Sequence, residues 1–309
     1  MRRIPSRSAA ILGVSPLCAP VLLSSVLLSS VLLSAVLLSA VLLCAGCAGA
    51  AGVRPLAAGS SPDRPSPVSS APVSATASPS VSQPAAPLAG KIVGIDPGHN
   101  GGNFTHPAYL ARQIWNGRED EDCDTTGTET AGGYTEARFN FNVATYLAAD
   151  LVAEGARVVL TRHSDTGVGP CVNTRSEIIN RAHADVAIDI HADGGPVTGR
   201  GFTVLEPVAD GPNDAVIRSS IRFGAYVRAA MLRYTSMPES DYYGHDGLIF
   251  RNDLAGLNLT TVPKVLVECG NMRNPTDARL LTRPSFQREI ARAFAAAITK
   301  FLTGRTTTG

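Results

Sequence analysis

Residues 156–190, ARVVLTRHSDTGVGPCVNTRSEIINRAHADVAIDI, carry the pattern that decides the fold. An apolar, β-rich run at 156–161 and a second one at 185–190 enclose a segment long enough for a helix. Within that segment, Thr174 and Glu177 have the spacing of a capping box at a helix start. Strands that alternate with helices belong to parallel sheets, so this stretch predicts a strand–helix–strand unit.

The same alternation continues on both sides of this stretch. Further strands are predicted at 91–95, 201–206 and 263–268, and further helices at 135–153, after Asn213, and from Pro284 to Gly304. In the helix after Asn213, we expect Ile217, Ile221 and Leu232 on the buried side. The pattern predicts an α/β fold: one domain with a mainly parallel sheet and helices on both faces.

The composition places the start of the folded domain near Lys91. All 16 Phe and Tyr residues and the single Trp lie at or beyond Phe104, and aromatic side chains supply much of the apolar area of a core. We therefore expect one folded domain at 91–309. From Lys91 onward the chain has 22 Lys and Arg against 25 Asp and Glu, so it lacks the basic surface of a nucleic-acid-binding protein. We expect no nucleic-acid partner, and a monomer.

The amino-terminal segment, 1–47, has the pattern of a targeting sequence. Three arginines within the first seven residues precede a long apolar run that contains five tandem five-residue units at 21–45. Small residues precede Cys47, an arrangement that resembles a lipoprotein box with Cys47 as the lipidated residue. The run is also long enough for an uncleaved membrane anchor. Each alternative predicts export to the cell envelope, either secreted or held at the membrane.

The next segment, 48–90, is a predicted linker. It consists mainly of Ala, Pro, Ser, Thr and Val, and it contains almost no charge. Such a composition is typical of an extended, disordered tether, which would let the domain search a layer near the membrane.

Three cysteines lie in the folded part. Cys123 and Cys171 lie in polar, glycine-containing segments, whereas Cys269 is embedded in the apolar run VLVEC. In an exported protein two of them can pair, and we predict a Cys123–Cys171 disulfide. Cys269 is then interpreted as a small buried apolar residue rather than as a reactive thiol.

Polar residues at strand ends are the candidates for chemistry, because ligands of parallel sheets bind outside the carboxyl ends of the strands. His99 follows the first strand, His191 follows the DVAIDI strand, and Glu268 ends the PKVLVE strand. Glu136 lies in the first turn of the first long helix. Two imidazoles and two carboxylates are thus predicted at one edge of the sheet.

This set of residues is sufficient for metal-assisted amide hydrolysis. Two histidines and one glutamate suit a catalytic Zn²⁺ that retains an open position for water. The second glutamate would take the proton of that water and pass it to the leaving amine. The spacing by itself contains no local zinc signature such as HExxH.

Four segments resemble the signature segments of the zinc-dependent N-acetylmuramoyl-L-alanine amidase family. They are IDPGHNGG, GYTEARFNFNVATYLAADL, NTRSEIINRAHADVAIDIHADGG and KVLVECGNMRNPTDARLL, and together they span the folded domain. The resemblance is closest to compact members without wall-binding repeats, and it implies a sheet of about six strands. It also implies zinc held by His99, Glu136 and His191, with Glu268 as the catalytic acid–base. One departure is Asp189, where many members carry Ser.

The implied function is hydrolysis of the amide bond between N-acetylmuramic acid and L-alanine by a zinc-activated water, with peptidoglycan or muropeptides as substrate. One alternative is a zinc peptidase that cuts within the stem peptide. Another is a non-catalytic, wall-binding lipoprotein. Tyr242, Tyr243 and Arg251 are further candidates to line a substrate groove, whereas His106, His163, His183 and His245 have no partner pattern.

Overall fold

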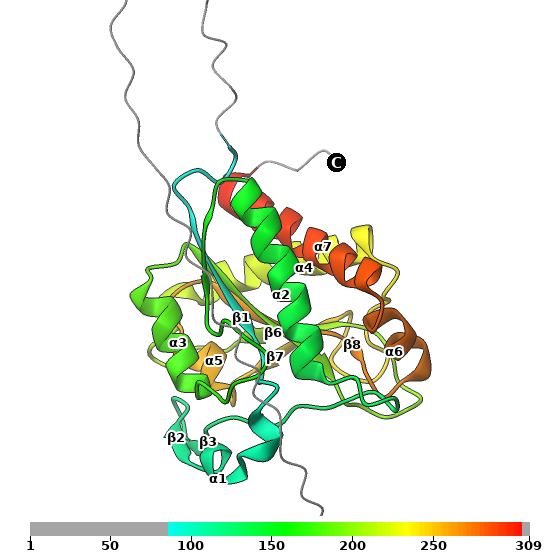
Figure 1. Ribbon diagram of the computed structural model, residues 1–309. Helices are drawn as coiled ribbons and strands as arrows, with labels where there is room; N and C mark the ends of the chain where they lie inside the picture. The colour runs from blue at the N-terminus through cyan, green and yellow to red at the C-terminus, as the bar shows by residue number, and fades with distance from the viewer. Residues whose placement is uncertain (1–85, 305–309) are drawn as a thin grey trace, which may run out of the picture. The chain divides into compact units, whose positions relative to one another are not determined.

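The structure, a computed structural model, describes residues 86–304 (Figure 1). The predictions for the leader at 1–47, including Cys47, lie outside this range, as does the linker prediction up to residue 85. Among the described helices, none has the length and apolar character needed to cross a bilayer.

A six-stranded sheet forms the centre of the domain. Its strands are β1 (Ile92–Pro97), β4 (Arg157–Leu160), β5 (Val186–Asp193), β6 (Thr203–Pro207), β7 (Leu248–Arg251) and β8 (Lys264–Asn271). Their order is β4-β1-β5-β8-β6-β7, and only the β6–β8 pair is antiparallel. The predicted α/β fold with a mainly parallel sheet of about six strands is confirmed.

Helices cover both faces of this sheet. On one face lie α2 (Glu136–Ala153), α4 (Ile217–Tyr234) and α7 (Pro284–Thr303), and their apolar residues share one core with β1 and β5 (Figure 1). On the other face lie α3 (Val172–Arg181) and α5 (Ala255–Asn258), which bury smaller apolar clusters. Alternate residues of β5 enter the two layers: Val186 and Ile188 lie in the large core, whereas Ala187 packs with Ile179 of α3.

The segment between β1 and α2 forms a separate small substructure. It contains the 3₁₀ turn η1 (Asn103–Thr105), helix α1 (Pro107–Leu110) and an antiparallel hairpin of β2 (Gln113–Trp115) and β3 (Asp120–Asp122). The remaining elements are η2 (Asp214–Val216) and α6 (Pro275–Leu281). Neither this hairpin nor β7 is indicated by the sequence pattern.

Two local predictions are wrong. Helix α3 begins at Val172, ahead of the predicted capping box, and Thr174 lies inside its first turn. Helix α4 begins at Ile217 and buries Phe223, Val227 and Met231, whereas Ile221 and Leu232 are 36% and 45% exposed. The helix carries apolar residues on more than one side, so the sequence pattern favoured a neighbouring stripe over the one that faces the sheet.

Two strands extend further than predicted, which changes how the site is built. β5 continues through His191 to Asp193, and β8 continues through Glu268 to Asn271. His191 and Glu268 are directly paired across the two strands, just before an irregularity in the ladder. Glu268 therefore lies on a strand, as predicted, and His191, which was expected to follow its strand, also lies within one.

Candidate metal centre and active site

His99 stands two residues beyond β1, with a left-handed backbone conformation (φ 56°) that is uncommon outside glycine. Its Nδ1 lies 3.1 Å from the carbonyl oxygen of Thr125 and 3.3 Å from Oδ1 of Asp124. Its Nε2 lies 3.3 Å from Oε1 of Glu136. The ring is thus held at one nitrogen and presents the other to the site.

Glu136 occupies the first turn of α2, directly after the N-cap residue Thr135, whose side chain accepts a hydrogen bond from the backbone of Arg138. Glu136 is buried, with 4% of the residue exposed. Its Oε2 accepts a hydrogen bond from the backbone N–H of Thr128 (2.9 Å), and its Oε1 accepts one from that of Ala192 (3.2 Å). Two backbone donors therefore fix the carboxylate at the start of the helix.

His191 lies on β5, with its ring so close to Gly98 that a Cβ atom there would lie 2.2 Å from Cε1 and Nε2 of the ring. Its Nδ1 lies 2.9 Å from Oε1 of Glu136, and its Nε2 lies 3.3 Å from Oδ1 of Asp189. The centroids of the His99 and His191 rings are 4.8 Å apart, with the ring planes nearly perpendicular.

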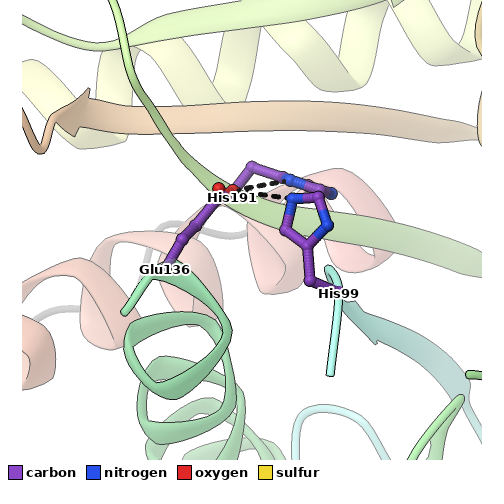
Figure 2. A group of neighbouring side chains, drawn as sticks. All are labelled: His99, Glu136 and His191. Carbon is purple, nitrogen blue, oxygen red and sulfur yellow. Dashed lines mark hydrogen bonds and ion pairs between the residues drawn. The ribbon is translucent and has the colours of Figure 1, made fainter. Parts of the chain in front are cut away.

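The structure brings these three side chains, from three separate elements, to one point (Figure 2). His99, Glu136 and His191 each offer one ligand atom, and these atoms lie within 4.8 Å of one another. Two imidazole nitrogens and one carboxylate oxygen form a donor set that suits Zn²⁺ and leaves a coordination position open. This set fits the metal that the sequence analysis predicts.

The electrostatics of the triad favour positive charge at this point. Burial opposes a charged ring at His99, but the carboxylates of Glu136 and Asp124 outweigh it and raise the His99 pKa to about 9. Burial is likewise outweighed at His191, whose pKa is raised by Asp189 and Glu136. The pKa of Glu136 is lowered by both histidines against the effect of burial. The same surroundings would stabilise a bound cation.

Glu268 lies beside the triad, paired in register with His191. Its Oε2 is enclosed and has no hydrogen-bond partner among the described residues. Burial, together with the negative charges of Glu136 and Asp193, raises the pKa of Glu268 to about 8, although the two histidines oppose this shift. A carboxyl group with a pKa near neutrality is suited to exchange protons during a reaction.

The triad and Glu268 open into a common cavity of about 350 Å³. Arg251 contributes to its wall together with Leu205 and Leu266. Of the predicted groove residues, Tyr242 donates a hydrogen bond from its hydroxyl to Oδ2 of Asp193 (2.7 Å), and Asp193 also lines the cavity. A substrate could thus reach the triad between an apolar wall and an arginine.

The structure also pairs Cys123 with Cys171, with an S–S distance of 2.08 Å, and Cys269 is a buried free cysteine. Burial raises the pKa of the Cys269 thiol well above its usual value, which disfavours a reactive thiolate. Neither His106 nor His245 lies among the residues that line the triad cavity.

Several residues that support the site were missed in the sequence. Asn140, one helical turn after Glu136, donates to the carbonyl oxygen of Gly98 (3.1 Å) and lies 3.5 Å from Oε1 of Glu136. The i, i+4 spacing on a helix could have indicated this contact. Asp124, in contrast, reaches His99 from a loop, and no local pattern marks it.

Comparison with known proteins identifies one family. Residues 93–300 match the family described as N-acetylmuramoyl-L-alanine amidase. An N-acetylmuramoyl-L-alanine amidase of Mycobacterium tuberculosis is 39% identical over 230 residues, which cover 72% of this chain and 91% of that protein.

Solved structures agree with this match. The crystal structure of an N-acetylmuramyl-L-alanine amidase from Mycobacterium smegmatis is 40% identical, covers 71% of this chain and 99% of that chain, and has a TM-score of 0.66. An N-acetylmuramoyl-L-alanine amidase of Nostoc punctiforme is 25% identical, covers 69% of this chain and 97% of that chain, and has a TM-score of 0.52.

Proposed function

This chain belongs to the N-acetylmuramoyl-L-alanine amidase family and hydrolyses the amide bond between N-acetylmuramic acid and L-alanine in peptidoglycan, and we propose that it does so with zinc. In this proposal His99, Glu136 and His191 hold the ion, and Glu268 is the general acid–base. The observation that supports it most directly is the convergence of the three donor atoms within 4.8 Å, beside Glu268.

The protein groups around the triad are arranged to keep the ligands ready for the metal. When bound, zinc lowers the pKa of a coordinated water to about 7 and polarises a carbonyl group. His99 and Glu136 are oriented by hydrogen bonds to the 124–128 loop, and Glu136 is oriented further by the backbone of β5. These contacts lower the entropic cost of assembling the site.

Glu268 carries the proton in this scheme. Glu268 lines the cavity beside the triad, so its carboxylate can accept a proton from the attacking water and return it to the amine that leaves with L-alanine. Because its pKa lies near 8 before a cation is present, and a cation lowers it, the carboxylate form is accessible at neutral pH.

Arg251 and the residues around it contact the substrate in this proposal. The Arg251 guanidinium is paired with Asp253 and with the Tyr243 hydroxyl, its side chain is 27% exposed, and the residue lines the cavity. We further propose that the apolar and arginine-lined wall receives the stem peptide, which carries carboxylates.

We also propose that the protein acts outside the cytoplasm as a monomer. The arginine-containing apolar leader at 1–47 supports export, and the tether at 48–90 supports reach into the wall layer. Attachment through a lipid at Cys47, an uncleaved membrane helix and free secretion remain three forms of this proposal, separated by mass analysis of the mature amino terminus.

Analysis of the products of wall digestion tests the reaction. Incubation of peptidoglycan with the zinc-loaded protein should release whole stem peptides that begin with L-alanine, and mass spectrometry identifies them. The Glu268→Gln variant removes the proton carrier with little change in shape, and we expect turnover to fall by roughly 10²- to 10⁴-fold.

The matched control is Glu206→Gln, which alters a buried carboxylate on neighbouring β6 that does not line the cavity. This control should retain the turnover of the parent. Full activity of Glu268→Gln would contradict the acid–base role. Fragments cut within the stem peptide would favour the zinc-peptidase alternative, and a folded, zinc-loaded parent without turnover would favour the non-catalytic one.

A further inference from the structure

Each histidine of the triad contacts a different aspartate through the nitrogen that does not face Glu136. His99 directs Nε2 toward Glu136 and has Nδ1 3.3 Å from Asp124. His191 directs Nδ1 toward Glu136 and has Nε2 3.3 Å from Asp189. Nδ1 of His99 also lies 3.1 Å from the carbonyl oxygen of Thr125, and the Asp189 contact is an ion-pair distance in which Oδ1 of Asp189 makes no hydrogen bond to the described residues. A carboxylate beside the second ring nitrogen favours one orientation of a ligand histidine.

The two aspartates are the ends of a continuous buried chain of ion pairs. Asp124 contacts Nη2 of Arg175 (3.2 Å), and Nη1 of Arg175 contacts Asp96 (3.1 Å). Nζ of Lys264 then bridges Asp96 (2.9 Å) and Asp189 (3.4 Å). The five side chains are between 1% and 7% exposed. We call this set, Asp124–Arg175–Asp96–Lys264–Asp189, the buried ion chain.

The contacts leave little freedom to the members of this chain. Asp124 also accepts hydrogen bonds from Asn103 (3.1 Å) and from the backbone of Thr125 (2.7 Å). Asp96 also accepts one from the hydroxyl of Thr161 (2.6 Å). Because buried charges without partners are strongly destabilising, Arg175 and Lys264 have few alternative positions away from these aspartates.

The buried ion chain and Glu136 together carry a formal charge that matches a divalent ion. Three aspartates and two cations give the chain a formal charge of −1, and Glu136 brings the total to −2. A divalent cation between His99, Glu136 and His191 would neutralise this buried charge. The chain thus contributes to the field at the triad as well as to its geometry.

We propose that Asp189 and Asp124 are positioning residues that orient His191 and His99 for the metal, and that Lys264, through Asp96 and Arg175, fixes the two aspartates relative to each other. This inference rests on the proposed zinc site. Lys264 is its most specific element, since its ion pairs among the described residues are with Asp96 and Asp189 and not with a ligand of the proposed site.

Zinc affinity of the full chain, measured by competition with a chromophoric chelator, tests this arrangement. Asp189→Asn keeps the shape of the side chain and removes its charge, and we expect zinc affinity to fall 10- to 100-fold. Lys264→Met should also weaken zinc binding, although it lies one residue further from the metal. Because both act on His191 through the same contact, the loss in the double variant should be smaller than the product of the two single losses.

Asp277→Asn is the matched control, because Asp277 is a fully buried aspartate paired with an arginine outside the buried ion chain. It should bind zinc with parental affinity even if its melting temperature falls. The double variant Asp189→Asn/Lys264→Met, which keeps the net charge, is measured in any case and preserves the test if a single variant does not fold.

Three results would overturn the inference. The first is zinc affinity within twofold of the parent in Asp189→Asn or in the double variant. The second is a loss of zinc affinity in Asp277→Asn equal to that in Asp189→Asn. The third is a parent that binds no zinc, which would overturn the proposed function as well, whereas the first two leave that function intact.

Discussion

Gly98 shows how a single residue determines the spacing of the site. A Cβ atom at this position would lie 2.2 Å from Cε1 and Nε2 of His191, closer than any real contact. The next residue, His99, already adopts a left-handed conformation. The approach of the two histidines to one point therefore depends on the absence of a side chain at Gly98.

We expect Gly98→Ala to reduce amidase turnover by about 100-fold, because the added methyl group displaces the His191 ring by a sizeable fraction of an ångström or more. Turnover on peptidoglycan measures this effect. Gly132→Ala is the matched control, since the nearest atom to a Cβ there is 3.9 Å away. Equal turnover of Gly98→Ala and the parent would show that the close packing has no role in activity.

The negative charge of Glu206 destabilises the folded protein. It lies on β6, is 3% exposed and approaches Gly224 of α4. Burial raises its pKa to about 7. The folded protein therefore retains the proton to higher pH than the unfolded chain does. The protonated Glu206 side chain makes its full contribution to the free energy of unfolding below the unfolded pKa of about 4.5. This contribution is lost as the pH rises through 7 and the side chain becomes charged.

Glutamine carries no charge at any pH, so the replacement of Glu206 by glutamine removes the loss of stability at high pH. Glu206→Gln should raise the free energy of unfolding relative to the parent at pH 8, by about 3 kcal/mol at most, and should give no such gain at pH 4. Urea unfolding of both proteins at the two pH values measures the difference. A gain of the same size at both pH values would contradict the assigned titration.

At the scale of elements, the amino terminus of helix α3 is stabilised by a backbone contact with the disulfide-linked loop and not by a capping side chain. Its N-cap is Cys171, which makes no side-chain capping hydrogen bond. The first helical N–H, that of Val172, instead donates to the carbonyl oxygen of Cys123 (2.8 Å). The disulfide thus secures both the loop before α2 and the beginning of α3.

We therefore expect Cys123→Ser/Cys171→Ser to lower the free energy of unfolding by up to about 4 kcal/mol, the loop-entropy value for a separation of 48 residues. Chemical denaturation in the absence of reductant measures this loss against the parent. Cys269→Ser gives a comparison for serine at a buried position that forms no disulfide. No loss in the double variant would show that the cross-link does not stabilise the fold.

Periodicity predicted some elements well and others poorly, for physical reasons. Helices α2 and α7 each bury one regular stripe, so their spacing alone identified them. Strand β7 is a four-residue edge strand with partly exposed side chains. A run this short shows no periodicity that distinguishes a strand from a loop. Helix α4 was found, but its buried face depends on the sheet it covers.

At the scale of the whole molecule, the candidate site was predictable because parallel strands bring their carboxyl ends together. That rule selected His99, His191 and Glu268 before any contact was known. The buried ion chain was not predictable. Lys264 and Asp96 are 168 positions apart in the sequence. The sequence around Lys264 indicates only the start of an apolar strand. Such long-range pairs follow from the complete topology alone.

The central claim is that one zinc ion is shared by three side chains from separate elements. Anomalous diffraction from crystals of the zinc-loaded protein, collected at the zinc edge, tests it directly. We predict a single strong peak within about 2.0–2.2 Å of ligand atoms of His99, Glu136 and His191. A map with no peak between these residues, or with its peak elsewhere on the protein, would contradict the account.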